Sequence, residues 1–321
     1  MKLLQPSLLY RCYSSTSAGA LVSGKGSRPT HNRVFSGNEV QSEFQLHHQL
    51  NNTRPTALIS TTDSVLNALR RALNKYYGDE EEPNQIWIVI IKIPRDAPPL
   101  LLHHAQDLAR EINLPQSEQK LFKHEFLFEY QIPQELVVHK VSVRSLVERG
   151  LGFEHCVMAS PNGGLLFPPL GDFKHNIVEN WLKPSPDNAF EVGIRLGSMA
   201  RAFGARAPLD DIAHRILYDC MRSYIHADSQ RVVVKYSGGR SDSLDLEYFC
   251  WIQDGIDTVL CEWWLTDPEF LTAYEKLQQW ICKKLEDIAE PPENCFWKYQ
   301  LEAAESELDQ EIETAILEMG L

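Results

Sequence analysis

The sequence has no segment long and apolar enough to cross a membrane as a helix. Its longest apolar stretch surrounds Ile86–Ile93, whereas a membrane-spanning helix needs about 20 apolar residues. Basic residues are also scarce, since 44 acidic side chains outnumber 31 basic ones and the net charge is −13. Such a surface disfavours phosphate backbones and anionic lipids. We therefore expect neither a membrane nor a nucleic acid among the partners.

Cysteine pairs and ligand clusters are missing as well. The seven cysteines are odd in number and contain no C-x-x-C pair, which excludes a disulfide framework and a cysteine zinc site. No two histidines stand four residues apart beside a third ligand, so we expect no metal. Ser237-Gly238-Gly239 is not followed by the lysine of a phosphate-binding loop. These absences favour a protein of the reducing cell interior, with the cytoplasm as the expected location.

Acidic residues are absent from the first 38 positions. Glu39 is the first acid, and the preceding segment is basic and rich in serine, which resembles a mitochondrial transit peptide. A mitochondrial location is therefore an alternative to the cytoplasm. The other interpretation is that Leu8–Arg11 is simply the first strand of the fold. Near the other end, residues 286–321 are strongly acidic and carry apolar residues at helical spacing, which predicts an acidic amphipathic helix.

The length of 321 residues fits one large domain or two ordinary ones. We predict an α+β fold with a first domain at 8–150, a Pro- and Gly-rich linker at 151–185, and a mostly helical accessory domain at 186–321 that contains a β-hairpin. In the first domain the pattern predicts strands at Leu8–Cys12, Pro55–Thr62, Ile86–Ile93, His124–Ile132 and Val137–Val143, of which Ile86–Ile93 is expected to be buried on both faces. It predicts a helix capped by Asp63, a helix near His103–Ile112, and a helical turn at Ser145–Glu148. Residues 15–40 show no periodicity and are expected to be a connection.

The second half has a different pattern. Apolar periodicity predicts helices at about 188–203 and 208–226. A hairpin is expected from Arg231–Tyr236 and Leu244–Ile252 around Ser237-Gly238-Gly239, followed by a turn at Asp254-Gly255, a strand at Thr258–Leu265, and a helix from Thr266 to about Asp287.

Three short segments of the first half carry the candidate chemistry. They are Leu9-Tyr10-Arg11, Ile59-Ser60-Thr61-Thr62, and Glu125 at the start of FLFEYQIP. In this order they resemble the Arg–Ser-Thr-Ser–Glu pattern of mono-ADP-ribosyltransferases of the cholera-toxin and heat-labile-enterotoxin type. Residues 8–150 also resemble a fungal domain family of unknown function for which the same fold is expected. The resemblance implies a split β-sheet domain that takes NAD as its substrate.

The resemblance assigns a role to each residue. Cleavage of NAD builds positive charge on the ribose, so a carboxylate should lie nearby, and Glu125 is the candidate. The fork-shaped guanidinium of Arg11 would contact the pyrophosphate or ribose. Ser60, supported by Thr61 and Thr62, would hold the cleft and orient the carboxylate. The family also implies a ribose-binding histidine in the interval before Ser60, where His47 and His48 stand and His48 is the candidate.

Each residue has an ordinary structural explanation. An arginine at a strand end usually forms an exposed ion pair. Ser-Thr-Thr-Asp before a helix is explained by capping of the helix N-terminus, and a glutamate in a strand can face solvent. Arginine-modifying members of the family also carry an acid two positions before the catalytic one, where this chain has Lys123. A lysine cannot accept a proton from an incoming nucleophile. Transfer of ADP-ribose to a macromolecule, hydrolysis of NAD by water, and an inactive protein-interaction module therefore all stay open.

Overall fold

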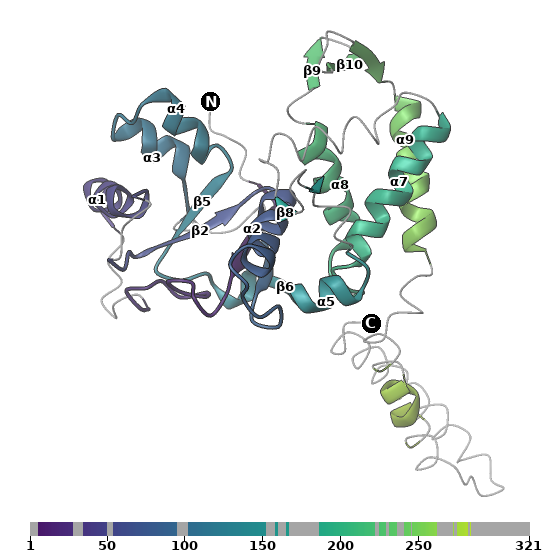
Figure 1. Cartoon of the computed structure of the whole chain (residues 1–321), viewed down its shortest axis with the longest axis horizontal. Coiled ribbons are helices and arrows are strands. Elements are labelled where there is room, and N and C mark those ends of the chain that lie inside the picture. Colours follow the sequence, from purple (N-terminus) through teal and green to yellow (C-terminus); the bar gives the residue numbers. More distant parts are fainter. Residues whose placement is uncertain are drawn as a thin grey trace, which may run out of the picture.

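The computed structural model describes residues 6–27, 35–49, 54–94, 102–151, 158–159, 165–166, 186–221, 225–228, 231–235, 241–244 and 246–261, together with helical positions 272, 275–281 and 283. Its first half is built on an antiparallel six-stranded sheet with the strand order β4-β5-β2-β1-β3-β6. The strands are β1 (Leu8–Tyr13), β2 (Leu58–Thr62), β3 (Trp87–Lys92), β4 (Leu102–His104), β5 (Glu125–Glu129) and β6 (Val137–Ser142). The protein is thus a mixed fold of antiparallel strands and helices (Figure 1).

Helices cover the sheet and form most of the second half. Those of the first half are α1 (Gly37–His47), α2 (Val65–Tyr77), α3 (Ala105–Glu111), the short α4 (Gln116–Gln119) and α5 (Val143–Glu148), with 3-10 turns at Lys120–Phe122 and Gln134–Leu136. The second half contributes α7 (Pro186–Arg201), α8 (Leu209–Met221) and α9 (Leu246–Leu260). It also contains a three-stranded sheet of β9 (Ile225–Asp228), β10 (Arg231–Lys235) and β11 (Ser241–Leu244), and a two-stranded ladder of β7 (Met158–Ala159) and β8 (Leu165–Leu166).

The most apolar segment of the sequence forms the centre of the sheet. β3 pairs with β1 on one side and β6 on the other, and its residues 88–91 are fully buried. A strand that packs on both faces needs apolar side chains at successive positions, which is what the sequence provides here. The predicted strands around β1, β2, β3, β5 and β6 and the predicted helix α2 are confirmed, and Leu8–Arg11 is a strand of the sheet.

The sheet is open between β1 and β2. These two strands share a single register pair, Tyr10 with Thr62, whereas the neighbouring pairs β1–β3 and β2–β5 run along whole strands. Beyond that pair, Arg11 and Cys12 of one strand and Ser60 of the other line a pocket. The divergence of two adjacent strands therefore creates the space in which the candidate residues meet.

Three predictions in the first half were wrong in detail. The unperiodic segment 15–40 ends inside helix α1, which begins at Gly37. The cap of α2 is Ser64 rather than Asp63, since the Ser64 hydroxyl accepts the N–H of Asn67. The predicted helix near His103–Ile112 begins two residues later, because Leu102–His104 pairs with β5 as β4.

The second half corrects the prediction that Leu244–Ile252 is a strand and Asp254-Gly255 a turn. The hairpin of β10 and β11 ends at Leu244, and the chain is helical from Leu246 to Leu260. Gly255 lies inside this helix because α9 crosses α7 there at very short range: a Cβ on Gly255 would lie 2.2 Å from the carbonyl oxygen of Phe190. The glycine therefore serves close helix packing rather than a turn.

The other expectations of the second half have mixed outcomes. Helices α7 and α8 confirm the two predicted helices, although residues 225–226 belong to strand β9. The helical positions 272, 275–281 and 283 agree with a helix from Thr266 to Asp287. Most of the predicted linker at 151–185 and the whole acidic helix at 286–321 lie outside the described residues. In the described ranges, no helix combines the length and apolar character needed to cross a membrane.

The two halves share one apolar core. Residues of α2, β3 and α5 pack in the same buried cluster as residues of α7, α8 and α9. At its centre, Asp219 of α8 is fully buried and its Oδ2 accepts the Ser64 hydroxyl at 2.8 Å and the backbone N–H of Leu66 at 3.1 Å. A carboxylate from the second half thus caps the N-terminus of α2, where the helix dipole favours negative charge.

Candidate functional site

The strand register brings Ser60 and Glu125 together. β2 and β5 pair antiparallel with Thr62 opposite Glu125, so Ser60 lies one diagonal step away on the same face of the sheet. The Ser60 hydroxyl donates a hydrogen bond to Oε1 of Glu125. The Glu125 side chain is 15% exposed, so it neither faces bulk solvent nor is sealed in the core.

His47 completes this contact from the end of α1. Its Nε2 lies 2.7 Å from the Ser60 hydroxyl oxygen and 3.9 Å from Oε1 of Glu125, and its Nδ1 lies 2.9 Å from the hydroxyl oxygen of Thr56. Because the Ser60 proton points to Glu125, Nε2 of His47 must be the donor to Ser60. His48, the histidine predicted for the ribose, lines the same pocket but packs edge-on against the ring of Phe44. The geometry favours His47 for the role.

The environment of Glu125 keeps its carboxylate ionised. Burial alone would raise its pKa, but the nearby imidazole of His47, the positive charge of Arg71 and the hydrogen bond from Ser60 together hold the pKa below its ordinary value. Among the described residues, its second oxygen Oε2 has no hydrogen-bond partner. The carboxylate can therefore accept a further hydrogen bond and stabilise a nearby positive charge.

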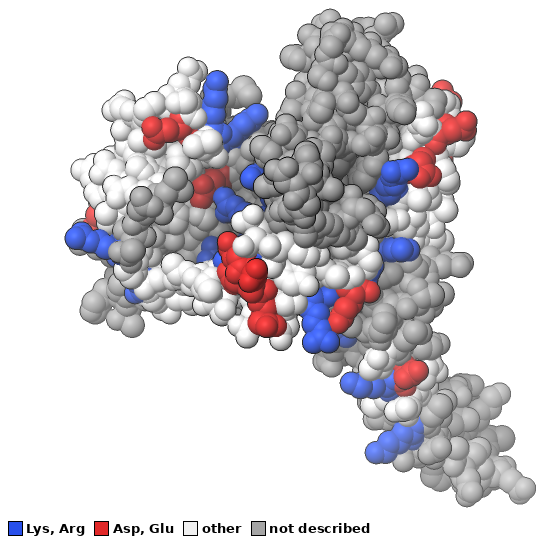
Figure 2. Space-filling view, viewed as in Figure 1, with Lys and Arg blue, Asp and Glu red and all other residues white. Residues whose placement is uncertain are grey.

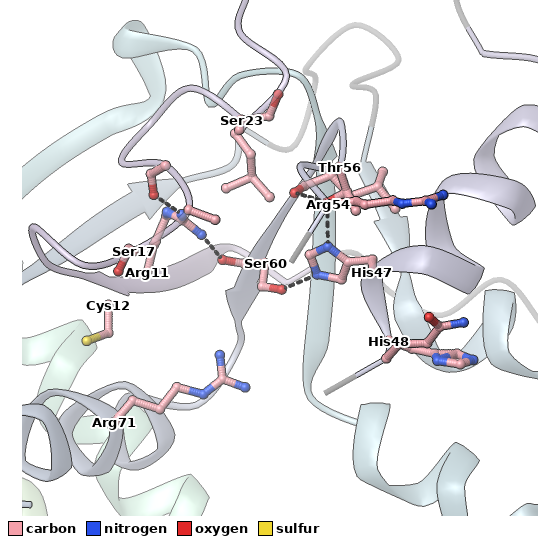
Figure 3. Close-up of a pocket in the computed structure, with 16 residues that line it drawn as sticks. Arg11, Cys12, Ser17, Ser23, His47, His48, Arg54, Thr56, Ser60 and Arg71 are labelled. Atoms are coloured by element: carbon pink, nitrogen blue, oxygen red, sulfur yellow. Dashed lines mark hydrogen bonds between the residues drawn. The ribbon is translucent and has the colours of Figure 1, made fainter. Parts of the chain in front are cut away.

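Arg11 lies across the open part of the sheet. Its Nη1 donates to the carbonyl oxygen of Ser60 at 2.7 Å, while Nε and Nη2 donate to the carbonyls of Ala20 and Gly19. The loop that presents these carbonyls is tight, since a Cβ on Gly19 would lie 2.2 Å from the carbonyl oxygen of Val22. The side chain of Arg11 therefore links β1, β2 and this loop around the pocket (Figure 3).

Of the three hydroxyl residues in the predicted motif, only Ser60 lines the pocket. The Thr61 hydroxyl donates to the carbonyl of Phe126 at 2.9 Å, and that of Thr62 accepts the N–H of Ser64 at 3.2 Å. Both threonines are buried. Their contacts hold β2 to β5 and start α2, so the predicted direct contact of Thr61 and Thr62 with a cofactor has no geometric support.

The pocket beside these residues has a volume of about 430 Å³, within the range of about 300–1,000 Å³ that is usual for small-molecule sites. All its ionisable side chains other than Cys12 are bases, and none of its lining residues is acidic; the bases are Arg11, His47, His48, Arg54 and Arg71. Elsewhere, acidic and basic side chains both occur on the face drawn in Figure 2. A basic pocket in a chain with a net charge of −13 is electrostatically suited to an anionic ligand.

Glu125 itself is not among the lining residues, but it accepts the hydrogen bond from Ser60 and lies 3.9 Å from His47, and both of these residues line the pocket. Lys123 is exposed in the segment before β5. Among the described residues, no group of three or more His, Cys, Asp or Glu side chains could hold a metal ion.

Sequence reasoning missed the position of two residues that the structure brings to the site. A capping box, Ser36 with Glu39 three residues on, marks the start of α1 and would have placed His47 in the last turn of a helix. Arg71 lies on the polar face of α2, which the periodicity of that helix does predict. That this face turns toward Ser60 depends on tertiary packing, which no local pattern encodes.

Comparisons with known proteins identify one similar solved structure and one matching domain family. No curated protein matches the sequence. The solved structure named EcPltA is similar at a TM-score of 0.29 with 14% sequence identity, over 51% of this chain and 83% of that chain. A family model of a domain of unknown function, DUF7587, matches residues 4–146. A DUF7587 domain is therefore found over residues 4–146, the part of the chain that contains Arg11, Ser60 and Glu125.

Proposed function

We propose that this protein binds NAD in the pocket between β1 and β2 and cleaves its nicotinamide–ribose bond, passing ADP-ribose to a macromolecule or to water. The observation that carries the proposal is the contact of Glu125 with Ser60 and His47 at the wall of a pocket whose charged lining residues are all bases. A dinucleotide with an anionic pyrophosphate suits the bases. A cationic transition state suits the carboxylate.

The chemistry follows from these groups. When the bond between C1′ of the ribose and the nicotinamide nitrogen breaks, its electron pair leaves with nicotinamide and positive charge develops on the ribose. Glu125, held ionised by His47 and Ser60, stabilises that charge and accepts a ribose hydroxyl proton in a hydrogen bond. The acceptor then forms its bond to C1′ and releases its proton to solvent. Arg11 and Ser60 keep the walls of the pocket in place.

Release of nicotinamide from labelled NAD tests this proposal. We expect the wild-type chain to release nicotinamide and Glu125→Gln to lower the rate by about a hundredfold or more, because the amide lacks the negative charge that faces the ribose. Glu148→Gln serves as the control, since its side chain is 60% exposed and its change alters net charge by the same amount. Lysate proteins added as acceptors distinguish transfer, which labels protein, from hydrolysis.

A second candidate is an inactive protein-interaction module with the same fold. Lys123 favours it, because a lysine at this place cannot accept a proton from an acceptor nucleophile. Equal release by the wild type and Glu125→Gln would contradict the enzymatic proposal. Absence of both NAD binding and nicotinamide release would support the interaction module instead.

A further inference from the structure

Arg11 has few donors left for a ligand. All three of its guanidinium nitrogens already donate to main-chain carbonyls, those of Gly19, Ala20 and Ser60. Arginine carries five N–H donors, so two remain, on nitrogens whose orientation is fixed by the existing bonds. The side chain is half-buried, and burial lowers its pKa to about 10. These contacts indicate that Arg11 holds together the main-chain segments that form the pocket wall.

Arg71 is in the opposite situation. It extends from α2 toward Ser60 in the pocket (Figure 3), its residue is exposed, and among the described residues it has no hydrogen-bond or ion-pair partner. Its charge is close enough to Glu125 and Arg11 to lower the pKa of both. An arginine in this state can place its planar fork on a phosphate without first breaking a protein contact.

The other bases of the pocket are engaged. His47 contacts both Ser60 and Thr56, and His48 packs against Phe44. Arg54 also interacts with other parts of the protein. Among the three arginines of the lining, Arg71 is thus the one whose full set of donors is available within the described part of the chain.

We infer that Arg71, rather than Arg11, binds the pyrophosphate of the dinucleotide, and that Arg11 is a structural residue that holds the opening between β1 and β2. This inference rests on the proposed function, because it takes a pyrophosphate-containing ligand as the occupant of the pocket. It places the phosphates on the α2 side of the pocket. The ribose that bears nicotinamide then lies toward Ser60, His47 and Glu125.

Calorimetric titration of the full chain tests the inference with inorganic pyrophosphate, ADP-ribose and nicotinamide riboside as probes. We expect Arg71→Gln to weaken binding of pyrophosphate and ADP-ribose by about ten- to a hundredfold, which is the usual effect of losing a charged hydrogen bond. Binding of nicotinamide riboside, which has no phosphate, should change little. Arg71→Lys keeps the charge but loses the fork, so it should recover part of the affinity.

Arg70→Gln is the matched control. Arg70 is the neighbouring arginine of the same helix, points about 100° away around the helix axis and does not line the pocket, so its replacement should leave the affinities unchanged. Added salt should weaken pyrophosphate binding of the wild type more steeply than that of Arg71→Gln. Arg11→Gln should lower the midpoint of thermal unfolding, whereas Arg71→Gln should not.

The outcomes separate this inference from the proposed function. Wild-type affinity for pyrophosphate and ADP-ribose in Arg71→Gln, or an equal loss in Arg70→Gln, overturns the inference even if NAD is still cleaved. Binding of pyrophosphate that depends on Arg71, without any release of nicotinamide from NAD, supports the phosphate site and contradicts the proposed reaction. A wild-type chain that binds none of the three probes overturns both.

Discussion

Two carboxylates in this protein each accept a hydrogen bond from a serine hydroxyl, and the two serines are only four residues apart. Ser60 donates to Glu125 at the wall of the pocket, and Ser64 donates to Asp219 in the core shared by the two halves. Glu125 is 15% exposed and keeps one oxygen without a partner among the described residues. Asp219 is fully buried and also accepts the backbone N–H of Leu66.

The comparison shows that burial and neighbouring groups decide what such a pair does. In the core, the carboxylate satisfies donors at the start of α2 and thereby joins residues more than 150 positions apart in the sequence. At the pocket, the carboxylate is only partly buried, keeps one oxygen without a partner among the described residues, and contacts Ser60, which lines the pocket. We therefore expect changes in the core pair to affect stability and changes in the pocket pair to affect binding and chemistry.

The largest loss of stability is expected from Asp219→Ala. This change leaves the Ser64 hydroxyl and the Leu66 N–H buried without their acceptor, so the free energy of unfolding should fall by about 3 kcal/mol. Asp219→Asn, which retains an accepting oxygen, should lose less. Denaturant unfolding of the full chain measures both. A loss in Glu125→Gln as large as that in Asp219→Ala would contradict the distinction between the two pairs.

A smaller loss of stability is expected from Gly255→Ala. The added Cβ would lie 2.2 Å from the carbonyl oxygen of Phe190, so α7 and α9 must move apart, at a cost of about 1–3 kcal/mol. The sign is informative, because alanine ordinarily stabilises a helix relative to glycine by up to about 1 kcal/mol. Gly37→Ala is the control, since nothing lies within 4 Å of a Cβ built there and no loss is expected. Equal effects of the two changes would show that close packing does not explain Gly255.

The same two regions show what a sequence can and cannot predict. Runs of apolar and β-branched residues located β2, β3 and β5, and helical periodicity located α2, because the residues that these elements bury are visible in the local sequence itself. Asp254-Gly255 has the composition of a turn, yet it lies in a helix, because the requirement at Gly255 comes from α7, about 60 residues earlier in the chain. Local composition carries no information about such a partner.

In the candidate site too, some features follow from the local sequence and others from tertiary packing. The order of Arg11, Ser60 and Glu125 along the chain could be recognised, and the register of β2 and β5 does bring the latter two together. The choice between His47 and His48 depends on where α1 ends. The position of Arg71 at the pocket depends on how α2 lies on the sheet. Asp219 lies in a segment with no local indication that it would reach Ser64. These contacts are products of tertiary packing.

A further prediction concerns acid. The pKa of Glu125 is lower in the folded protein than its ordinary value of 4.5, so its ionised form stabilises the fold above that value. As the pH falls through the folded pKa, which lies below 4.5, this contribution is lost. The wild type should therefore be destabilised by acid more than Glu125→Gln is. Denaturant unfolding between about pH 6 and about pH 3 gives the difference, and parallel curves for the two proteins would contradict the expectation.

A last prediction compares the reactivity of a thiol at the pocket with that of the exposed thiols in the helical half. Cys12 lines the pocket, and burial raises its pKa to about 11, whereas Cys250 and Cys261 are exposed. Because the thiolate is the reactive form, iodoacetamide near neutral pH should modify Cys12 on the order of a hundredfold more slowly than the exposed pair.

The same thiol can report on the ligand. Mass spectrometry of the alkylated peptides measures each rate, and saturating ADP-ribose should slow Cys12 further while the rates at Cys250 and Cys261 stay the same. Cys12 reacting as fast as the exposed thiols would contradict its burial. A Cys12 rate unchanged by ADP-ribose that the protein is shown to bind would mean that the ligand lies away from the opening between β1 and β2. In that case Glu125, like Asp219, would serve the stability of the fold, and the two carboxylates would differ only in how far they are exposed.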